Sequence, residues 1–216
     1  TKQLVANAAL HYTYGRGYYE EFKANQTLTN YALLPVVVRD PVTNNITGFV
    51  TNSDLVRRLW LDNDFYGTTY SLAYTPANNL NFTLGGAYNR YEGRHFDEVV
   101  WAQFANYNGA TSIRHRYNDN DAFKSDFNIF GRVNYQLDRL NIYADLQYRN
   151  VFYSFFGRVD ATNFEQQNAR LEFFNPKFGL TYNVTDRSNV YASVAVGNKE
   201  PNRRDFVDSN TGTRPK

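Results

Sequence analysis

The stretch FKSDFNIFGRVNYQLDRLNIYADLQYRNVFY, residues 123–153, decides the fold class of this chain. Apolar and polar side chains alternate over residues 123–135 and again over 140–153, with the short segment 136–139 between them. Successive side chains of a strand point to opposite faces, whereas a helix would place its apolar residues three or four positions apart. The stretch therefore predicts two long, half-buried strands joined by a tight turn.

The same alternation recurs along the chain, so about seven strands are expected. The other alternating segments are residues 4–14, 65–74, 80–91, 172–182 and 190–196. Short turns at 75–79, 136–139 and 183–188 join strand pairs, and the long polar segments 15–62, 92–121 and 156–171 separate the others. Short turns at one end and long extracellular loops at the other are typical of an outer-membrane β-barrel.

Strand length and aromatic placement favour the membrane barrel over a soluble sheet. The alternating segments run about 10–14 residues, which is enough to cross a bilayer at a tilt of about 45°. Aromatic rings gather near both strand ends, where a membrane protein meets the lipid headgroups. Those near the long loops include Tyr12, Tyr14, Tyr88, Tyr91 and Tyr148, and those near the short turns are Tyr74, Phe82, Tyr135 and Tyr182.

Composition excludes several classes of function. The net charge of +2 is too balanced to indicate nucleic acid as a partner. Cysteine is absent, so there is no disulfide framework and no thiolate zinc site. The three histidines are scattered along the chain, and no cluster has metal-ligand spacing, so we expect neither a metal site nor a cofactor. No run of 18 apolar residues predicts a transmembrane helix.

The polar face of the predicted strands is strongly hydrophilic and carries both signs of charge. Such a face suits a wet lumen or a polar partner domain better than the packed interior of a small barrel. Seven strands with a polar lumen cannot close, and open sheet edges in lipid are very costly. The strands should therefore form an arc of a larger barrel. The charged residues of this face are Lys124, Asp126, Arg132, Asp145, Arg149 and Lys177.

The stretch near the C-terminus that resembles a known family is FFNPKFGLTYNVTDRSNVYASVAVGNKEPNRRDFVDS, residues 173–209. This ordered set resembles the late barrel region of TonB-dependent outer-membrane receptors, especially those of the Bacteroidetes. An Asn-Pro-Lys strand, a short turn and a Tyr-Ala-Ser strand lead there into a polar loop. The residues that carry the resemblance are Asn175, Pro176, Lys177, Glu200, Pro201, Asn202 and Arg203.

The resemblance implies an all-β, antiparallel transmembrane β-barrel of 22 strands, of which residues 1–216 would form part of a single barrel domain. It also implies an outer-membrane receptor for a scarce ligand: a ferric siderophore, a vitamin, an oligosaccharide or a peptide. Import would use energy from the inner-membrane TonB complex, which would act through a plug domain that is not among these residues. Outer-membrane lipid and the ligand are the other partners expected.

Ligand contacts in such a receptor would come from the long segments between strands. The two tryptophans, Trp60 and Trp101, are candidates because an indole ring can stack on a sugar or a flat chelate, although a Trp in such a place more often packs a loop down or sits in the aromatic belt. Basic residues there would suit an anionic chelate, or they are ordinary solvated charges. These candidates are Arg94, His95, Arg114, His115 and Arg116.

Two other classes of protein stay open on the sequence alone. The strands of a soluble β-sandwich used for binding or adhesion show the same alternating pattern, and seven strands are a common number for that fold. An outer-membrane hydrolase would need a nucleophile–histidine constellation, for which His95 with Asp97 is the only local candidate. We expect transport and no catalysis.

Overall fold

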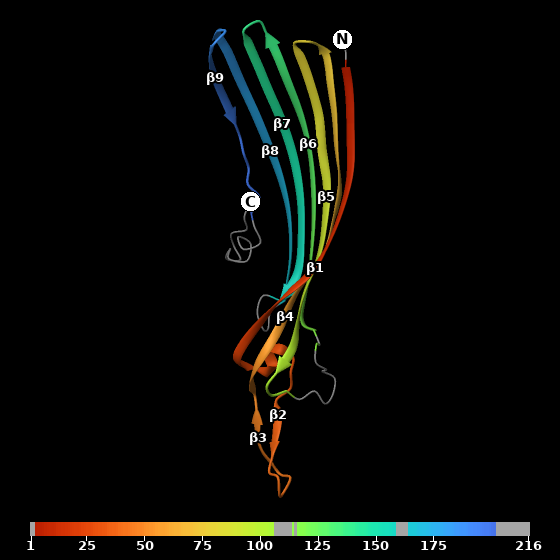
Figure 1. Cartoon of the computed structure of the whole chain (residues 1–216), viewed down its shortest axis with the longest axis vertical. Helices are drawn as coiled ribbons and strands as arrows, with labels where there is room; N and C mark the ends of the chain where they lie inside the picture. Colours follow the sequence, from red (N-terminus) through yellow and green to blue (C-terminus); the bar gives the residue numbers. More distant parts are fainter. Residues whose placement is uncertain (1–2, 106–113, 115, 159–163, 202–216) are drawn as a thin grey trace.

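The computed structural model describes residues 3–105, 114, 116–158 and 164–201 (Figure 1). Seven strands form one antiparallel sheet in the order β1-β4-β5-β6-β7-β8-β9, and β2 pairs with β3 in a separate hairpin. This confirms the all-β class and the seven strands. The elements are β1 (Gln3–Thr27), the 3-10 helix η1 (Leu28–Tyr31), β2 (Val36–Arg39), β3 (Ile46–Val50), β4 (Asn52–Ala77), β5 (Leu80–Ala102), β6 (Arg116–Leu137), β7 (Leu140–Arg158), β8 (Phe164–Thr185) and β9 (Ser188–Ala195).

Most strands run well past the ends that the alternation predicts. β1 continues to Thr27 and β4 begins at Asn52, so only residues 28–51 of the expected loop 15–62 lie outside the large sheet. Residues 92–102 and 116–121 of the second expected loop are also strand, as are 156–158 and 164–171 of the third. These extensions carry polar and aromatic side chains on both faces, so cross-strand pairs rather than hydrophobic alternation stabilise them.

The register of the sheet aligns the apolar side chains on one face, here called the apolar face. Leu72 lies opposite Leu84, Leu84 opposite Gly131, and Gly131 opposite Leu146, which in turn faces Pro176. A slip of one residue in any pair would move that strand's apolar set to the other face. The polar side chains consequently share the opposite face, here called the polar face.

A band of nine residues per strand lies on the apolar face, and most of its ends carry an aromatic ring. It extends from Tyr74 to Tyr66 on β4, from Leu80 to Tyr88 on β5 and from Tyr135 to Phe127 on β6, nine residues in each case. β7 and β8 repeat it over residues 140–148 and 174–182. Beyond the band, charged residues such as Arg90 and Glu172 take over this face. Nine residues match the 9–11 that a tilted strand needs to cross the hydrocarbon core.

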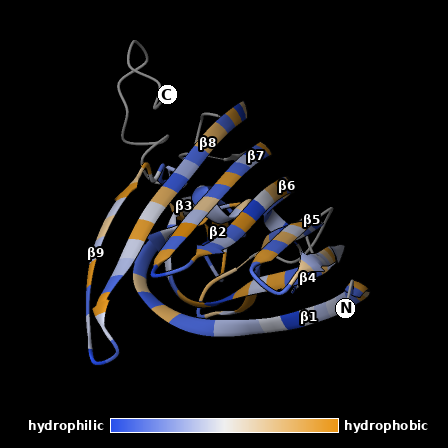
Figure 2. Cartoon of the chain, turned by 90° about the horizontal axis from the view of Figure 1, so that it is seen from above, coloured by the Kyte–Doolittle hydropathy of each residue, from blue (hydrophilic) through white to orange (hydrophobic). Residues whose placement is uncertain are grey.

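The apolar face lacks a covering layer within the part of the chain that the structure describes. Leu10 is 87% exposed and Leu84 is 47% exposed, although both belong to the apolar pattern and Leu84 lies at its centre. Seen along its long axis, the sheet is an open, curved wall (Figure 2). Large apolar side chains left exposed over so wide a surface indicate a hydrophobic environment, here lipid. Within the same described residues, no helix has the length and apolar character that a membrane span requires.

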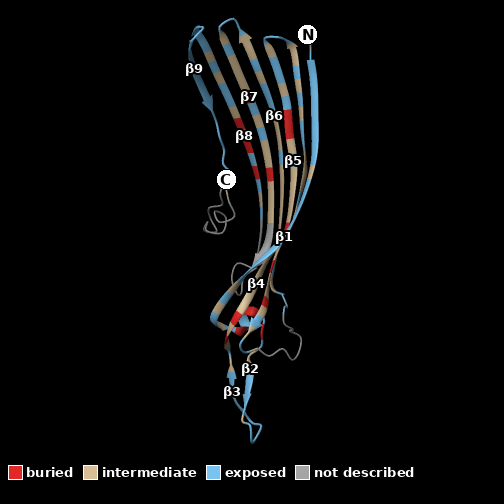
Figure 3. Cartoon of the chain, in the orientation of Figure 1, coloured by how far each residue is buried: buried red, intermediate tan, exposed pale blue. Residues whose placement is uncertain are grey.

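A small buried core lies at the far end of the molecule, away from the short turns (Figure 3). The segment after β1 folds back through η1, whose Leu28 amide donates to the Thr51 carbonyl at 2.8 Å. Ala32 ends η1 in the left-handed conformation, with φ of 54°. The resulting cluster, here called the tip core, holds the long extensions together. Its buried members are Leu28, Tyr31, Leu33, Leu55 and Val99.

The membrane band predicts how the two faces respond to charge. Leu84→Arg, at the centre of the band on the apolar face, should destabilise folding of the full-length protein into phospholipid vesicles by about 2–4 kcal/mol. Thr69→Arg is the matched control, because it lies on the polar face beside Ala9 and Ala87 and should have a much smaller effect. Urea titration followed by electrophoretic mobility measures both. Equal losses for the two variants would contradict the assignment of the faces.

Candidate functional site

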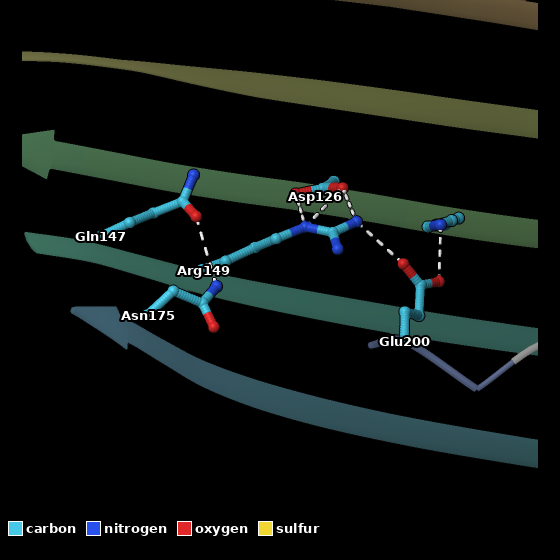
Figure 4. Close-up of polar contacts among 6 residues, drawn as sticks. Asp126, Gln147, Arg149, Asn175 and Glu200 are labelled. Carbon is cyan, nitrogen blue, oxygen red and sulfur yellow. Dashed lines mark hydrogen bonds and ion pairs between the residues drawn. The ribbon is translucent and has the colours of Figure 1, made fainter. Parts of the chain in front are cut away.

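A network of charged and amide side chains crosses the polar face of β6, β7 and β8 (Figure 4). At its centre, the Arg149 guanidinium on β7 donates to both carboxylate oxygens of Asp126 on β6, from Nε at 3.0 and 3.1 Å. Both residues lie on the polar face, as the alternation predicts. A bidentate arginine–carboxylate pair fixes the orientation of both groups more firmly than a single contact does.

A second ion pair lies nearer the short turns on the same face. Arg132 donates through Nε and Nη2 to Asp145 Oδ2 at 3.1 and 2.9 Å, and the Tyr143 hydroxyl donates to the same oxygen at 2.9 Å. Lys177 lies opposite Asp145 on the next strand. Asp145 is only 5% exposed, and these three donors compensate the cost of burying its charge.

The chain beyond β9 leaves the sheet edge and turns onto the polar face. The Val196 amide still donates to the Pro176 carbonyl at 2.9 Å, in continuation of the ladder. Two residues later, the Asn198 amide and its side-chain Nδ2 both donate to Asn175 Oδ1, each at 2.9 Å. Asn175 in turn donates to Gln147 Oε1 at 3.2 Å, so the turn is anchored to β8 and β7. Residues 196–200 are here called the crossing segment.

Glu200 ends the crossing segment between two cations. Its Oε1 accepts from Lys124 Nζ on β6 at 2.6 Å, and its Oε2 accepts from Arg149 Nη2 on β7 at 2.8 Å. One carboxylate therefore joins the segment after β9 to two strands on the other side of β8. The distances are those of charge-assisted hydrogen bonds, which are stronger than bonds between neutral groups.

The structure brings together most of the residues that carried the family resemblance. Asn175 and Lys177 lie on the polar face, and Pro176 between them points to the apolar face. Pro176 lacks an amide hydrogen, but its carbonyl still pairs with Val196. Glu200 lies in the network, and Pro201 follows it half-buried. Asn202 and Arg203 lie outside the described residues.

Trp60 is packed between strands rather than presented on a loop. Its ring lies 4.6 Å from Tyr18 and 5.6 Å from Phe96, centroid to centroid, and its indole N–H donates to Glu98 Oε2 at 3.1 Å. The guanidinium of Arg16 sits over the same ring at 5.0 Å. Continuous register places Trp60 on the same side of the sheet as the apolar face.

The other candidate ligand contacts do not converge on one place. Arg94 is exposed and lies on the same side of the sheet as Trp60, whereas His95 lies on the side of the polar face. Arg116 stacks on Phe96 with its guanidinium carbon 3.6 Å from the ring centroid. Trp101 is 46% exposed at the end of β5, and the Arg114 amide donates to the Val99 carbonyl at 3.0 Å. His115 lies outside the described residues.

Asp97 lies on the polar side of the β5 extension, close to the tip core. Its carboxylate accepts from Asn118 Nδ2 at 3.0 Å. Burial raises the pKa of Asp97, while the Asn118 hydrogen bond and the Arg57 charge act in the opposite direction. Burial likewise raises the pKa of the Tyr117 hydroxyl, beside it. Asp97 and His95 share one face of the strand, but Asp97 is engaged by β6 rather than by a nucleophile.

Metal-ligating side chains are dispersed over the described parts of the chain. Within residues 3–105, 114, 116–158 and 164–201, no three histidine, aspartate or glutamate side chains gather closely enough to hold a metal ion. The carboxylates of the polar face are instead bound to arginine and lysine. This network can hold polar groups in fixed positions on the face of the sheet opposite the apolar face.

Three features define a segment of an outer-membrane β-barrel wall. They are the exposed apolar band, the polar face crossed by ion pairs, and the short turns that join the strands at one end. The sequence matches the family model described as TonB dependent receptor-like, beta-barrel, over residues 2–215. The chain belongs to this family, whose members reside in the bacterial outer membrane and transport ligands with TonB. Comparison with curated proteins gave no match.

Family membership decides between the folds that the alternation left open. A β-sandwich buries its apolar face against a second sheet, whereas here that face is exposed. The soluble-sandwich interpretation is therefore wrong. The prediction of a Bacteroidetes-type receptor is more specific than the family match and stays a prediction.

The anchor of the crossing segment can be tested by removing one side chain. Asn175→Ala deletes the acceptor of the Asn198 amide, so that amide should exchange with solvent about 2- to 10-fold faster, as expected for a hydrogen bond worth about 0.5–1.5 kcal/mol. Gln147→Ala is the control, since it removes only the support behind Asn175. Hydrogen exchange on the full-length protein in micelles measures both. Unchanged exchange in Asn175→Ala would contradict the anchoring.

Asp97 predicts a pH dependence of the tip. A carboxyl whose folded pKa is raised favours folding when protonated, so stability falls as pH rises through that pKa. Asp97→Asn should therefore slow amide exchange in the β5–β6 extensions at pH 7 and lose this advantage in acid, below the ordinary pKa of aspartate. Asp119→Asn, whose carboxylate is 53% exposed, is the control. A variant less protected than the native protein at pH 7 would contradict the argument.

Proposed function

We propose that this chain forms part of the wall of an active-transport receptor that binds a scarce ligand at the cell surface and imports it with TonB-derived energy. The single observation that carries the proposal is the two-faced sheet. Its apolar face is exposed over a band of nine residues per strand, and its polar face is lined by side chains held in hydrogen-bonded networks. The family match over residues 2–215 supports this assignment.

The orientation follows from the loops. In barrels of this class the short turns are periplasmic and the long loops extracellular. We therefore place the turns at residues 78–79, 138–139 and 186–187 on the periplasmic side. The strand extensions, the tip core and the β2–β3 hairpin then stand outside the cell. β5 continues 14 residues past Tyr88, which at about 3.3 Å per residue is roughly 46 Å measured along the strand.

The ligand class proposed remains broad: a ferric siderophore, a vitamin, an oligosaccharide or a peptide. Trp101 and Arg114, which are exposed, are the better placed of the predicted contacts, whereas Arg94 lies on the side of the sheet that carries the apolar face. Trp60 is better explained by its packing between Tyr18 and Phe96. A plug domain would occupy the space beside the polar face and engage the TonB complex.

We propose no catalytic role. Family members are transporters. Asp97, the partner that a His95-based hydrolase would need, is bound by Asn118 and lies in the field of Arg57. Replacing His95 with alanine should leave the rate of ligand uptake unchanged, apart from any effect on local folding.

Deletion of the native gene in its host tests the transport function. The deletion strain should grow more slowly only when one class of nutrient is limiting: chelated iron, a vitamin, an oligosaccharide or a peptide. Plasmid-borne native protein should restore growth, and the Leu84→Arg variant should restore it less. Uptake should stop when the inner-membrane proton gradient is dissipated. Growth unaffected under all four limitations, or uptake that continues without the gradient, would overturn the proposal.

A further inference from the structure

We propose that Lys124 and Arg149 form a carboxylate-binding site on the polar face, that Glu200 occupies it as an internal ligand, and that a carboxylate of the transported ligand displaces Glu200. This inference rests on the proposed transport function and adds to it a chemical class of ligand. It also makes the crossing segment a movable part of the wall. Figure 4 shows the site with Glu200 in place.

The geometry is that of a bound carboxylate. Each oxygen of Glu200 has its own cation: Oε1 accepts from Lys124 Nζ at 2.6 Å, and Oε2 accepts from Arg149 Nη2 at 2.8 Å. The two cations come from different strands, and Asp126 orients the guanidinium of Arg149 from the other side. Because the positions of these groups are fixed by β6 and β7, the site is preorganised for one planar anion with two oxygens.

Charge explains why the site would hold an anion after Glu200 leaves. With Glu200 in place, two cations face two carboxylates and the site is neutral. Without it, Lys124 and Arg149, whose side chains are 32% and 26% exposed, face Asp126 alone, which leaves one net positive charge. An incoming carboxylate therefore gains the charge-assisted hydrogen bonds that Glu200 gives up.

Glu200 is held in a way that permits exchange. Its side chain is 22% exposed, and its backbone lies beyond the end of β9, outside the sheet ladder. Between the ladder and Glu200, the crossing segment is anchored by the hydrogen bonds of Asn198 to Asn175 and to the Phe174 carbonyl. Segments held by few hydrogen bonds open at a lower cost than strands paired on both sides.

The experiment uses the purified full-length receptor in detergent micelles with a single cysteine at Lys199→Cys, introduced into a background without other cysteines. Lys199 is exposed and adjoins Glu200, so a fluorescent label there reports the position of the crossing segment. Succinate is the probe, and succinamide is its uncharged counterpart. Calorimetry on the same preparations measures succinate affinity.

Succinate should shift the label signal saturably, and succinamide should not. Glu200→Gln should place the label in the shifted state without any probe and should bind succinate about tenfold or more tightly, because the site is open in every molecule. Lys124→Gln should weaken that binding by at least about tenfold. Glu172→Gln removes the same charge from the opposite face and should behave as the native protein.

Two outcomes would overturn the site. One is succinate binding in Glu200→Gln that is no tighter than in Glu172→Gln, and the other is binding that survives Lys124→Gln unchanged. Neither measurement needs an energised membrane, so a negative result would remove the carboxylate site and leave the transport function standing. Loss of the transport function in the deletion strain would be seen independently, in growth.

Discussion

The hydrogen bonds of the backbone are the constraint on which this structure depends. In the hydrocarbon core of a membrane no water is present to satisfy an exposed N–H or C=O group, so each strand must pair with its neighbours over the whole span. The continuous antiparallel ladders meet this requirement for the strands between the two edges of the sheet, β4 to β8. Because pairing is obligatory, the sequence can vary only in the side chains on each face of the sheet. Apolar side chains on one face and polar side chains on the other then give the strict alternation along each strand.

The two faces then solve opposite problems. On the apolar face, Leu84 and its neighbours lose nothing by exposure because the surrounding medium is lipid. On the polar face, charges such as Asp145 are removed from bulk water and are stable only when paired. The ion pairs of Arg132 and Arg149 with neighbouring strands are a consequence of this, and they fix a polar wall along which a ligand or a plug domain can be positioned.

Beyond the membrane band the physical problem changes again, and the chain solves it as a soluble protein does. Water satisfies the backbone there, so pairing is optional and needs side-chain support. The tip core around Leu28 and Leu55 and the stacked rings of Tyr18, Trp60 and Phe96 provide that support. The extensions therefore behave as a folded outer part of the wall and not as free loops.

The amino-acid sequence alone determined the strands of the membrane band, the short turns and the division into two faces, because lipid enforces a period of two that is readable residue by residue. Asn175 and Glu200 were also recognisable, though only through their resemblance to a family. The tertiary structure decided that β1 and β4 continue far into an expected loop, that Trp60 is packed on the side away from His95, and that Glu200 reaches Lys124 across β8 and β7. These depend on contacts between residues 25 to 76 positions apart, which no local pattern encodes.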